Sequence, residues 1–99
     1  MTRVVVTEPA KRDIRNILSD LSERASYRIA ASYAEEFKAV YRRLGEFPAI
    51  GPPRAKLGPN CRITIVLPYL VVYDYANDEV TVLRVLHGRR NITRSLLRR

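Results

Sequence analysis

Residues 61–87 read CRITIVLPYLVVYDYANDEVTVLRVLH, and their pattern predicts three consecutive strands of a small sheet. Runs rich in β-branched and aromatic residues occupy 61–67, 70–75 and 80–87. Asn77 and Asp78 favour a tight turn between the second and third runs. The third run is apolar at nearly every position except Thr81 and Arg84, which predicts an interior strand. The first run alternates, which predicts one better-buried face made of Cys61, Ile63, Ile65 and Leu67.

The sequence before these strands predicts a loop and a long helix. Residues 47–60 contain four prolines and two glycines, which is typical of an irregular loop that crosses the molecule. A helix is predicted from about 26 to 44, with Gly45 as its C-cap. Its apolar side recurs with a 3.6-residue period at Ala30, Tyr33, Phe37, Val40, Tyr41 and Leu44.

A shorter helix and a strand are predicted nearer the N-terminus. Thr7 or Glu8 caps the helix, and Pro9 lies in its first turn, where the missing N–H costs nothing. The polar residues 22–26 are expected to end it, and the β-branched run 3–6 predicts a strand before it. Asp13 is assigned to the polar side of this helix, opposite a stripe of Ala10, Ile14, Ile17, Leu18 and Leu21.

The predicted order of elements is β-α-α-β-β-β. Two amphipathic helices that precede a meander must pack on one face of it, so we expect an α+β, two-layer fold with a helical hairpin on a small, mainly antiparallel sheet. The 99 residues predict a single domain, 1–99, with a basic C-terminal tail from about residue 88 and a helical turn near 92–97.

The charge distribution indicates a polyanionic partner. The net charge is +8, and residues 54–99 carry nine basic and three acidic side chains. Such an asymmetry attracts nucleic acid or an acidic protein surface, although a solubilising tail would have the same composition. Fifteen of the eighteen basic residues are arginine, which binds carboxylate and phosphate bidentately.

Several classes of protein are excluded by composition. Cys61 is the single cysteine, so no intrachain disulfide forms, and a reducing, cytoplasmic location is the simplest interpretation. The first residues lack the apolar core of a signal peptide, and the longest apolar stretch, 65–73, is interrupted by Pro68. One histidine and one cysteine do not make a metal site, and no Gly-rich phosphate loop occurs, so we expect no cofactor.

Four motifs in this order resemble the RelE/ParE toxin superfamily over about residues 4–93. They are TEPAKRDI at 7–14, FPAIG at 47–51, VVY at 71–73 and, most specific, LRVLHGRRN at 83–91, which is similar to many ParE sequences. The resemblance implies a toxin of a type II toxin–antitoxin or plasmid-stabilisation system. ParE-like members inhibit DNA gyrase and pair with a ParD-like ribbon–helix–helix antitoxin, whereas RelE-like members cleave mRNA on the ribosome.

The groups for RelE-type cleavage are mostly missing. Cleavage requires a base, an acid and cations around the phosphorane. Leu70 and Leu96 stand where the resemblance implies an arginine and a tyrosine, and residues 63–65 supply no lysine. The alternative, an endoribonuclease, would depend on a reduced site of His87, Arg62 and Arg90. His87 is otherwise a structural group at a strand end that hydrogen-bonds the backbone near Gly88, and Cys61 fits a half-buried strand position.

Arginines are the leading candidates for binding the target. We expect Arg84, Arg89, Arg90 and Arg94 to contact it, although Arg84 fits equally a paired, semi-buried structural role. Surplus apolar surface on the two helices would form a groove for an amphipathic antitoxin helix, and the residues expected there are Leu18, Leu21, Tyr33 and Phe37. A toxin that only retains its partner-binding fold is a third hypothesis.

Overall fold

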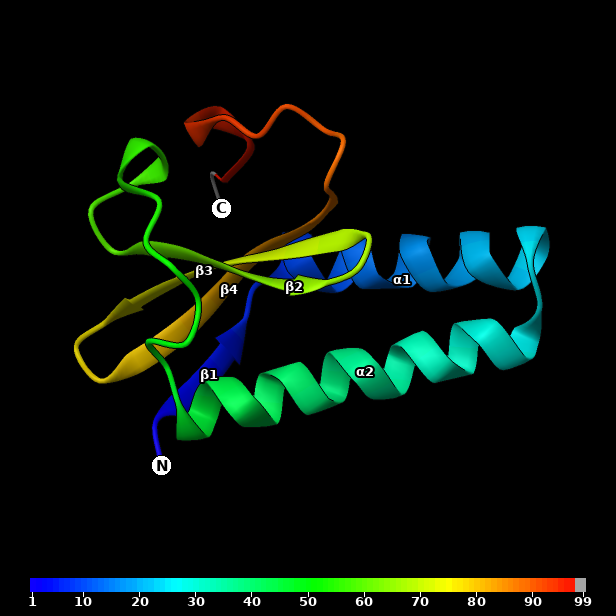
Figure 1. Ribbon diagram of the computed structural model, residues 1–99, viewed down its shortest axis with the longest axis horizontal. Coiled ribbons are helices and arrows are strands. Elements are labelled where there is room, and N and C mark those ends of the chain that lie inside the picture. The colour runs from blue at the N-terminus through cyan, green and yellow to red at the C-terminus, as the bar shows by residue number, and fades with distance from the viewer. Residues whose placement is uncertain (98–99) are drawn as a thin grey trace.

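The computed structural model describes residues 1–97 and contains a four-stranded sheet covered on one face by two helices (Figure 1). The strands are β1 (Arg3–Val6), β2 (Cys61–Val66), β3 (Tyr69–Ala76) and β4 (Glu79–His87). The helices are α1 (Glu8–Arg24) and α2 (Tyr27–Glu46), and two short 3-10 turns are η1 (Ala55–Leu57) and η2 (Arg94–Leu97). The predicted α+β order of elements is confirmed.

The sheet has the strand order β1-β4-β3-β2. β2, β3 and β4 form an antiparallel meander, whereas β1 pairs with β4 in parallel, with Val4 opposite Val80. Asn77 and Asp78 have φ values of 54° and 58°, as a two-residue type I′ turn requires, so the predicted turn is confirmed. A bulge between Val72 and Tyr73 shifts the pairing of β3 with β4.

The helix ends follow local capping chemistry with one departure from prediction. The side chains of Thr7 and Ser26 accept hydrogen bonds from the N–H groups of Ala10 and Ile29 at the two helix N-termini. α1 ends at Arg24, within the polar stretch 22–26 that was expected to break the helix. Gly45, expected as the C-cap, is buried in the last turn of α2, where an added Cβ would lie 3.3 Å from the Thr2 carbonyl oxygen. This close approach to the chain before β1 explains the glycine.

The main core lies between the helices and the sheet. Phe37 and Leu44 of α2 are 2% and 0% exposed, and they pack with Tyr73 of β3 and Val82 of β4. The hydroxyl of Tyr73 donates a hydrogen bond to the Pro48 carbonyl at 2.7 Å and accepts one from the Gly51 N–H at 2.9 Å. These two bonds fasten the proline-rich loop to the sheet.

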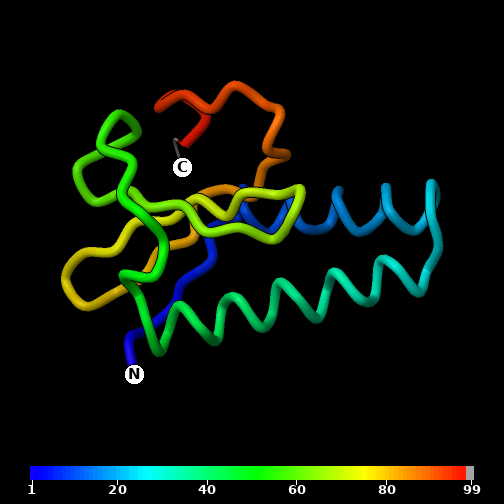
Figure 2. The backbone as a smooth tube through the Cα atoms, in the orientation of Figure 1, coloured from blue at the N-terminus to red at the C-terminus, as the bar shows by residue number. Residues whose placement is uncertain are grey.

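The second face of the sheet, opposite the helices, carries its own small cluster of Cys61, Ile63 and Val72. Leu57 of η1 packs on this cluster, as do Ile92 and Leu97 of the C-terminal segment. Figures 1 and 2 show both segments above the sheet while α2 lies below it. The residues after His87 therefore fold back over the sheet.

The predicted burial of β2 is wrong in its second half. Cys61 and Ile63 are buried, but Ile65 is 56% exposed, and Leu67, which is 77% exposed, lies beyond the end of the strand. η1 and the C-terminal segment reach only the first half of the strand, so nothing described covers Ile65. No helix among residues 1–97 is long and apolar enough to cross a membrane.

Candidate functional site

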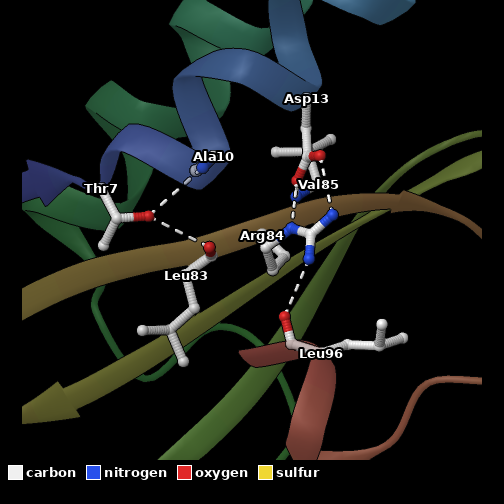
Figure 3. Close-up of polar contacts among 7 residues, drawn as sticks. All are labelled: Thr7, Ala10, Asp13, Leu83, Arg84, Val85 and Leu96. Carbon is white, nitrogen blue, oxygen red and sulfur yellow. Dashed lines mark hydrogen bonds and ion pairs between the residues drawn. The ribbon is translucent and has the colours of Figure 1, made fainter. Parts of the chain in front are cut away.

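Arg84 of β4 forms a bidentate ion pair with Asp13 of α1 (Figure 3). Its Nε donates to Asp13 Oδ2 at 2.6 Å and its Nη2 to Asp13 Oδ1 at 2.9 Å. The two side chains are only 18% and 13% exposed, so water screens the pair weakly. The hydrogen bonds to Asp13 raise the pKa of the Arg84 guanidinium further above its ordinary value. Arg84 is thus held as a charged structural group.

The Asp13 carboxylate also hydrogen-bonds the backbone of β4 beyond the point where the pairing with β1 ends. Asp13 Oδ2 also accepts the Val85 N–H at 3.0 Å. Thr7 Oγ1 donates to the Leu83 carbonyl at 3.1 Å while it caps α1 at Ala10. Figure 3 shows these contacts along one edge of the strand. The start of α1 is thereby fastened to the edge of β4 that lies beyond the last β1 pairing, at Val82.

Arg84 also connects the sheet to the C-terminal segment. Its third donor, Nη1, donates to the Leu96 carbonyl oxygen at 2.8 Å. Ile92 and Leu97 anchor the same segment by packing on the second face. A single guanidinium therefore joins α1, β4 and η2, and it fixes where residues 88–97 lie. The expected basic tail has a defined position in the structure.

The other predicted target-binding arginines are on the surface of this segment. Arg89, Arg90 and Arg94 are exposed. None of the ion pairs within residues 1–97 involves them. Arg90 lines a cavity beside η1, and Arg94 lines a neighbouring cavity with Asp74. Arg84 is committed to its structural contacts with Asp13 and Leu96. Arg89, Arg90 and Arg94 have no ion-pair partner within residues 1–97 and can bind an anion.

His87 ends β4 and is exposed. Its Nδ1 accepts a hydrogen bond from the Arg89 N–H at 3.1 Å, across Gly88. Its ring packs edge-on against Tyr69, with 5.8 Å between ring centroids. Because Nδ1 already accepts a backbone hydrogen bond, these contacts indicate that His87 stabilises the turn after β4.

Arg62 is committed to the proline-rich loop. Its Nη1 donates to the carbonyl oxygens of Gly51 at 2.8 Å and Ala49 at 3.1 Å. Side chains alternate along β2, and the neighbouring Cys61 and Ile63 lie on the second face. Arg62 therefore projects toward the face covered by the helices.

The three residues of the alternative nuclease site do not come together. Arg62 pairs with Tyr73, whereas His87 pairs with Tyr69, four residues earlier in β3. At about 3.3 Å per residue, this offset amounts to roughly 13 Å along the strands. Arg90 lines a cavity on the second face, opposite the side to which Arg62 projects. The three side chains therefore do not surround one position at which a scissile phosphate could bind.

The predicted antitoxin-binding residues differ in how accessible they are to a partner. Phe37 belongs to the core, and Leu18, Leu21 and Tyr33 are partly buried. The Tyr33 hydroxyl donates to the Leu67 carbonyl at 3.1 Å, and so ties α2 to the turn after β2. Of the four residues, Phe37 cannot reach a partner without rearrangement of the core.

A groove runs between α2 and the exposed end of β2. Its volume is about 470 Å³, and it is lined by Tyr33, Val40, Ile65 and Leu67 together with Glu36 and Arg43. Ile65 and Leu67 are among the most exposed apolar side chains of the described chain. The groove offers an apolar floor and charged walls to an amphipathic segment.

Cys61 is not suited to nucleophilic chemistry. It is 1% exposed, and burial raises the pKa of its thiol to about 11. The reactive thiolate is therefore scarce at neutral pH. Its position in the second-face cluster agrees with a packing role.

Sequence reasoning missed three residues of this region. Asp13 was assigned to the polar side of α1, but it lies three residues after the fully buried Ala10 and shares its side of the helix. That spacing was a signal for a carboxylate directed at the sheet. Arg54 and Lys56 were passed over as loop residues, although they lie in the same cavity as Arg90.

Comparison with known proteins gives consistent results for family and fold. A sequence profile described as "ParE toxin of type II toxin-antitoxin system, parDE" matches residues 4–92. Toxin ParE3 of Caulobacter vibrioides is 32% identical over 96 residues, which are 97% of this chain and 96% of that protein. A solved structure of a chromosomal ParDE TA system from P. aeruginosa superposes with a TM-score of 0.74 and 17% identity, over 88% of this chain and 96% of that one.

Proposed function

This chain belongs to the ParE toxin family of type II toxin–antitoxin systems, and we propose that it acts in the cytoplasm by inhibiting DNA gyrase. The proposed mode of action is binding to gyrase or to the gyrase–DNA complex. A binding protein of this kind stabilises one state of its target, so it requires differential affinity and no bond-breaking groups of its own.

The observation that carries the proposal is the separation of the nuclease candidates. Arg62 is bonded to two loop carbonyls, His87 accepts a backbone N–H, and Arg90 lies on the other face. General acid–base cleavage requires such groups within hydrogen-bond reach of one phosphate. In contrast, Arg89, Arg90 and Arg94 form no ion pair within residues 1–97 and lie on a segment bonded by Arg84, which suits recognition of an anionic surface.

The proposed inhibitor is a ParD-like ribbon–helix–helix antitoxin. The groove lined by Tyr33, Ile65 and Leu67 is a suitable place for an amphipathic segment of such a partner. Leu18 and Leu21 on α1 could extend the contact, while Phe37 would support the groove from within the core. An antitoxin that continued from this groove to the basic C-terminal segment would mask the surface that engages the target.

A gyrase assay on the purified protein tests the proposal. We expect the toxin to inhibit ATP-dependent supercoiling and to cause linear DNA to accumulate after detergent and protease treatment. Topoisomerase I serves as the control enzyme and should be unaffected. Unchanged gyrase activity at a large molar excess of folded toxin would refute gyrase as the target.

The His87→Ala variant separates the proposal from ribosome-dependent mRNA cleavage. A gyrase inhibitor should retain its growth-inhibiting activity in this variant, because His87 contributes only local contacts. A ribonuclease that used the imidazole as acid or base would lose about 10²-fold or more in rate. Loss of full-length mRNA on induction of the wild-type toxin, abolished in the variant, would favour the alternative.

A further inference from the structure

A basic cleft lies on the second face of the sheet, between η1 and the C-terminal segment. It is a cavity of about 460 Å³. Its floor is apolar, formed by Ile63, Leu70 and Ile92, and its exposed cations are Arg54, Lys56 and Arg90. We use "basic cleft" for these six residues. The loop before β2 supplies two of the cations, and the segment after β4 supplies the third, so they come from opposite walls.

Within residues 1–97, no acidic group forms an ion pair with the cations of the basic cleft. The described residues that line it include no carboxylate. Lys56 and Arg90 take part in no ion pair within residues 1–97, and the Arg54 guanidinium bonds only the adjacent Pro53 carbonyl, at 3.2 Å. Lys11, Arg24 and Lys38, on the helices, each pair with a nearby acid. Three unpaired cations around one cavity attract an anion with several charges.

The floor of the cleft restricts which polyanion fits. In the described part of the chain, the lining contains no aromatic side chain on which a base could stack and no hydroxyl or amide side chain. We therefore expect the cations to contact mainly the phosphates, which carry no sequence information. An aliphatic floor accommodates the apolar face of deoxyribose, and it offers no side-chain partner for a 2′-hydroxyl.

We propose that the basic cleft binds the phosphodiester backbone of single-stranded DNA, with Arg54, Lys56 and Arg90 each contacting a phosphate. The two walls favour a single strand, because its phosphates can be reached from both sides at once. The inference deepens the proposed function by assigning a DNA contact to this chain itself. Its test uses the toxin alone, so its failure would leave the gyrase proposal standing, and the reverse also holds.

The test is a fluorescence anisotropy titration of a labelled mixed-sequence DNA 12-mer with the full-length protein at several salt concentrations. Single strands give a slope of log K against log salt of about −0.7 per neutralised phosphate, so three contacts predict a slope of about −2. Arg90→Gln and Lys56→Gln should each reduce the slope by about 0.7. Arg28→Gln and Arg42→Gln, exposed positions on α2, are the matched controls and should leave it unchanged.

Three results would overturn the proposal. The first is an absence of DNA binding by protein whose circular dichroism shows that it is folded. The second is an equal effect of cleft and control substitutions, which would indicate diffuse attraction by the net charge. The third is preference for another ligand in competition: tighter binding of RNA of the same sequence, or of a polyglutamate peptide that the Gln variants no longer bind, would assign the cleft to that ligand.

Discussion

Asp13 and Arg84 lie 71 residues apart in the chain and are joined by two hydrogen bonds of 2.6 and 2.9 Å. The pair links the first helix to the last strand, and through the Leu96 carbonyl it reaches the C-terminal segment. The contribution of this pair to the free energy of unfolding and its effect on the C-terminal segment can be measured separately.

Asp13→Ala should destabilise the protein by about 3 kcal/mol, because it leaves Arg84 as a poorly solvated, unpaired charge and Val85 N–H without its acceptor. Urea denaturation followed by circular dichroism measures the loss. Asp20→Ala is the control, because it breaks the exposed Asp20–Arg24 pair and should cost less than about 0.5 kcal/mol. Similar losses in both variants would show that the buried pair contributes little.

Arg84→Lys should release the C-terminal segment while it keeps a positive charge beside Asp13. A lysine ammonium cannot bond both Asp13 oxygens and the Leu96 carbonyl in the fork geometry of arginine. Loss of a charged hydrogen bond worth about 1.5 kcal/mol predicts roughly tenfold faster amide exchange in residues 92–97. Hydrogen exchange with mass spectrometry detects this change, and Arg28→Lys is the control. Unaltered exchange would mean that Ile92 and Leu97 hold the segment without Arg84.

Tyr73→Phe should cost about 1–2 kcal/mol of stability, since the Pro48 carbonyl loses its donor and the buried Gly51 N–H loses its acceptor. Gly51 already lies close against β2, since a Cβ added at this position would be 2.5 Å from the Ile63 carbonyl oxygen. Thermal unfolding compares this variant with Tyr27→Phe, whose ring is 80% exposed and whose stability should not change. A neutral Tyr73→Phe would indicate that the loop is held by other contacts.

Charge reversal of Arg89, Arg90 and Arg94 to glutamate should abolish growth inhibition, because these exposed arginines are the proposed contacts with the target. Colony counts after induction give the readout. The same charge change at Arg12, Arg15 and Arg28, exposed on the helices, is the control and should leave the toxin active. Full toxicity of the C-terminal variant would remove this segment from the mechanism.

The sequence was sufficient for the elements and their order, because the helical and strand periodicities are strong and the Asn77–Asp78 turn has a characteristic signature. It did not reveal that the residues after His87 return over the sheet. Residues 88–99 contain only three apolar side chains, Ile92, Leu96 and Leu97, among arginines and polar residues, which is too few to show a helical or strand periodicity. The role of Arg84 was left open because its partner, Asp13, is remote in sequence and was assigned to solvent.

The parallel pairing of β1 with β4 has a consequence for the timing of synthesis. The first strand to leave the ribosome finds its strand partner only when the last one has been made, since Val4 pairs with Val80. Pairing of β1 with β4 forms late and slowly, because the two strands are far apart in the sequence. The β2–β3–β4 meander can pair as it is synthesised, but β1 has to wait for β4, so the complete four-stranded sheet arises only once translation has passed β4.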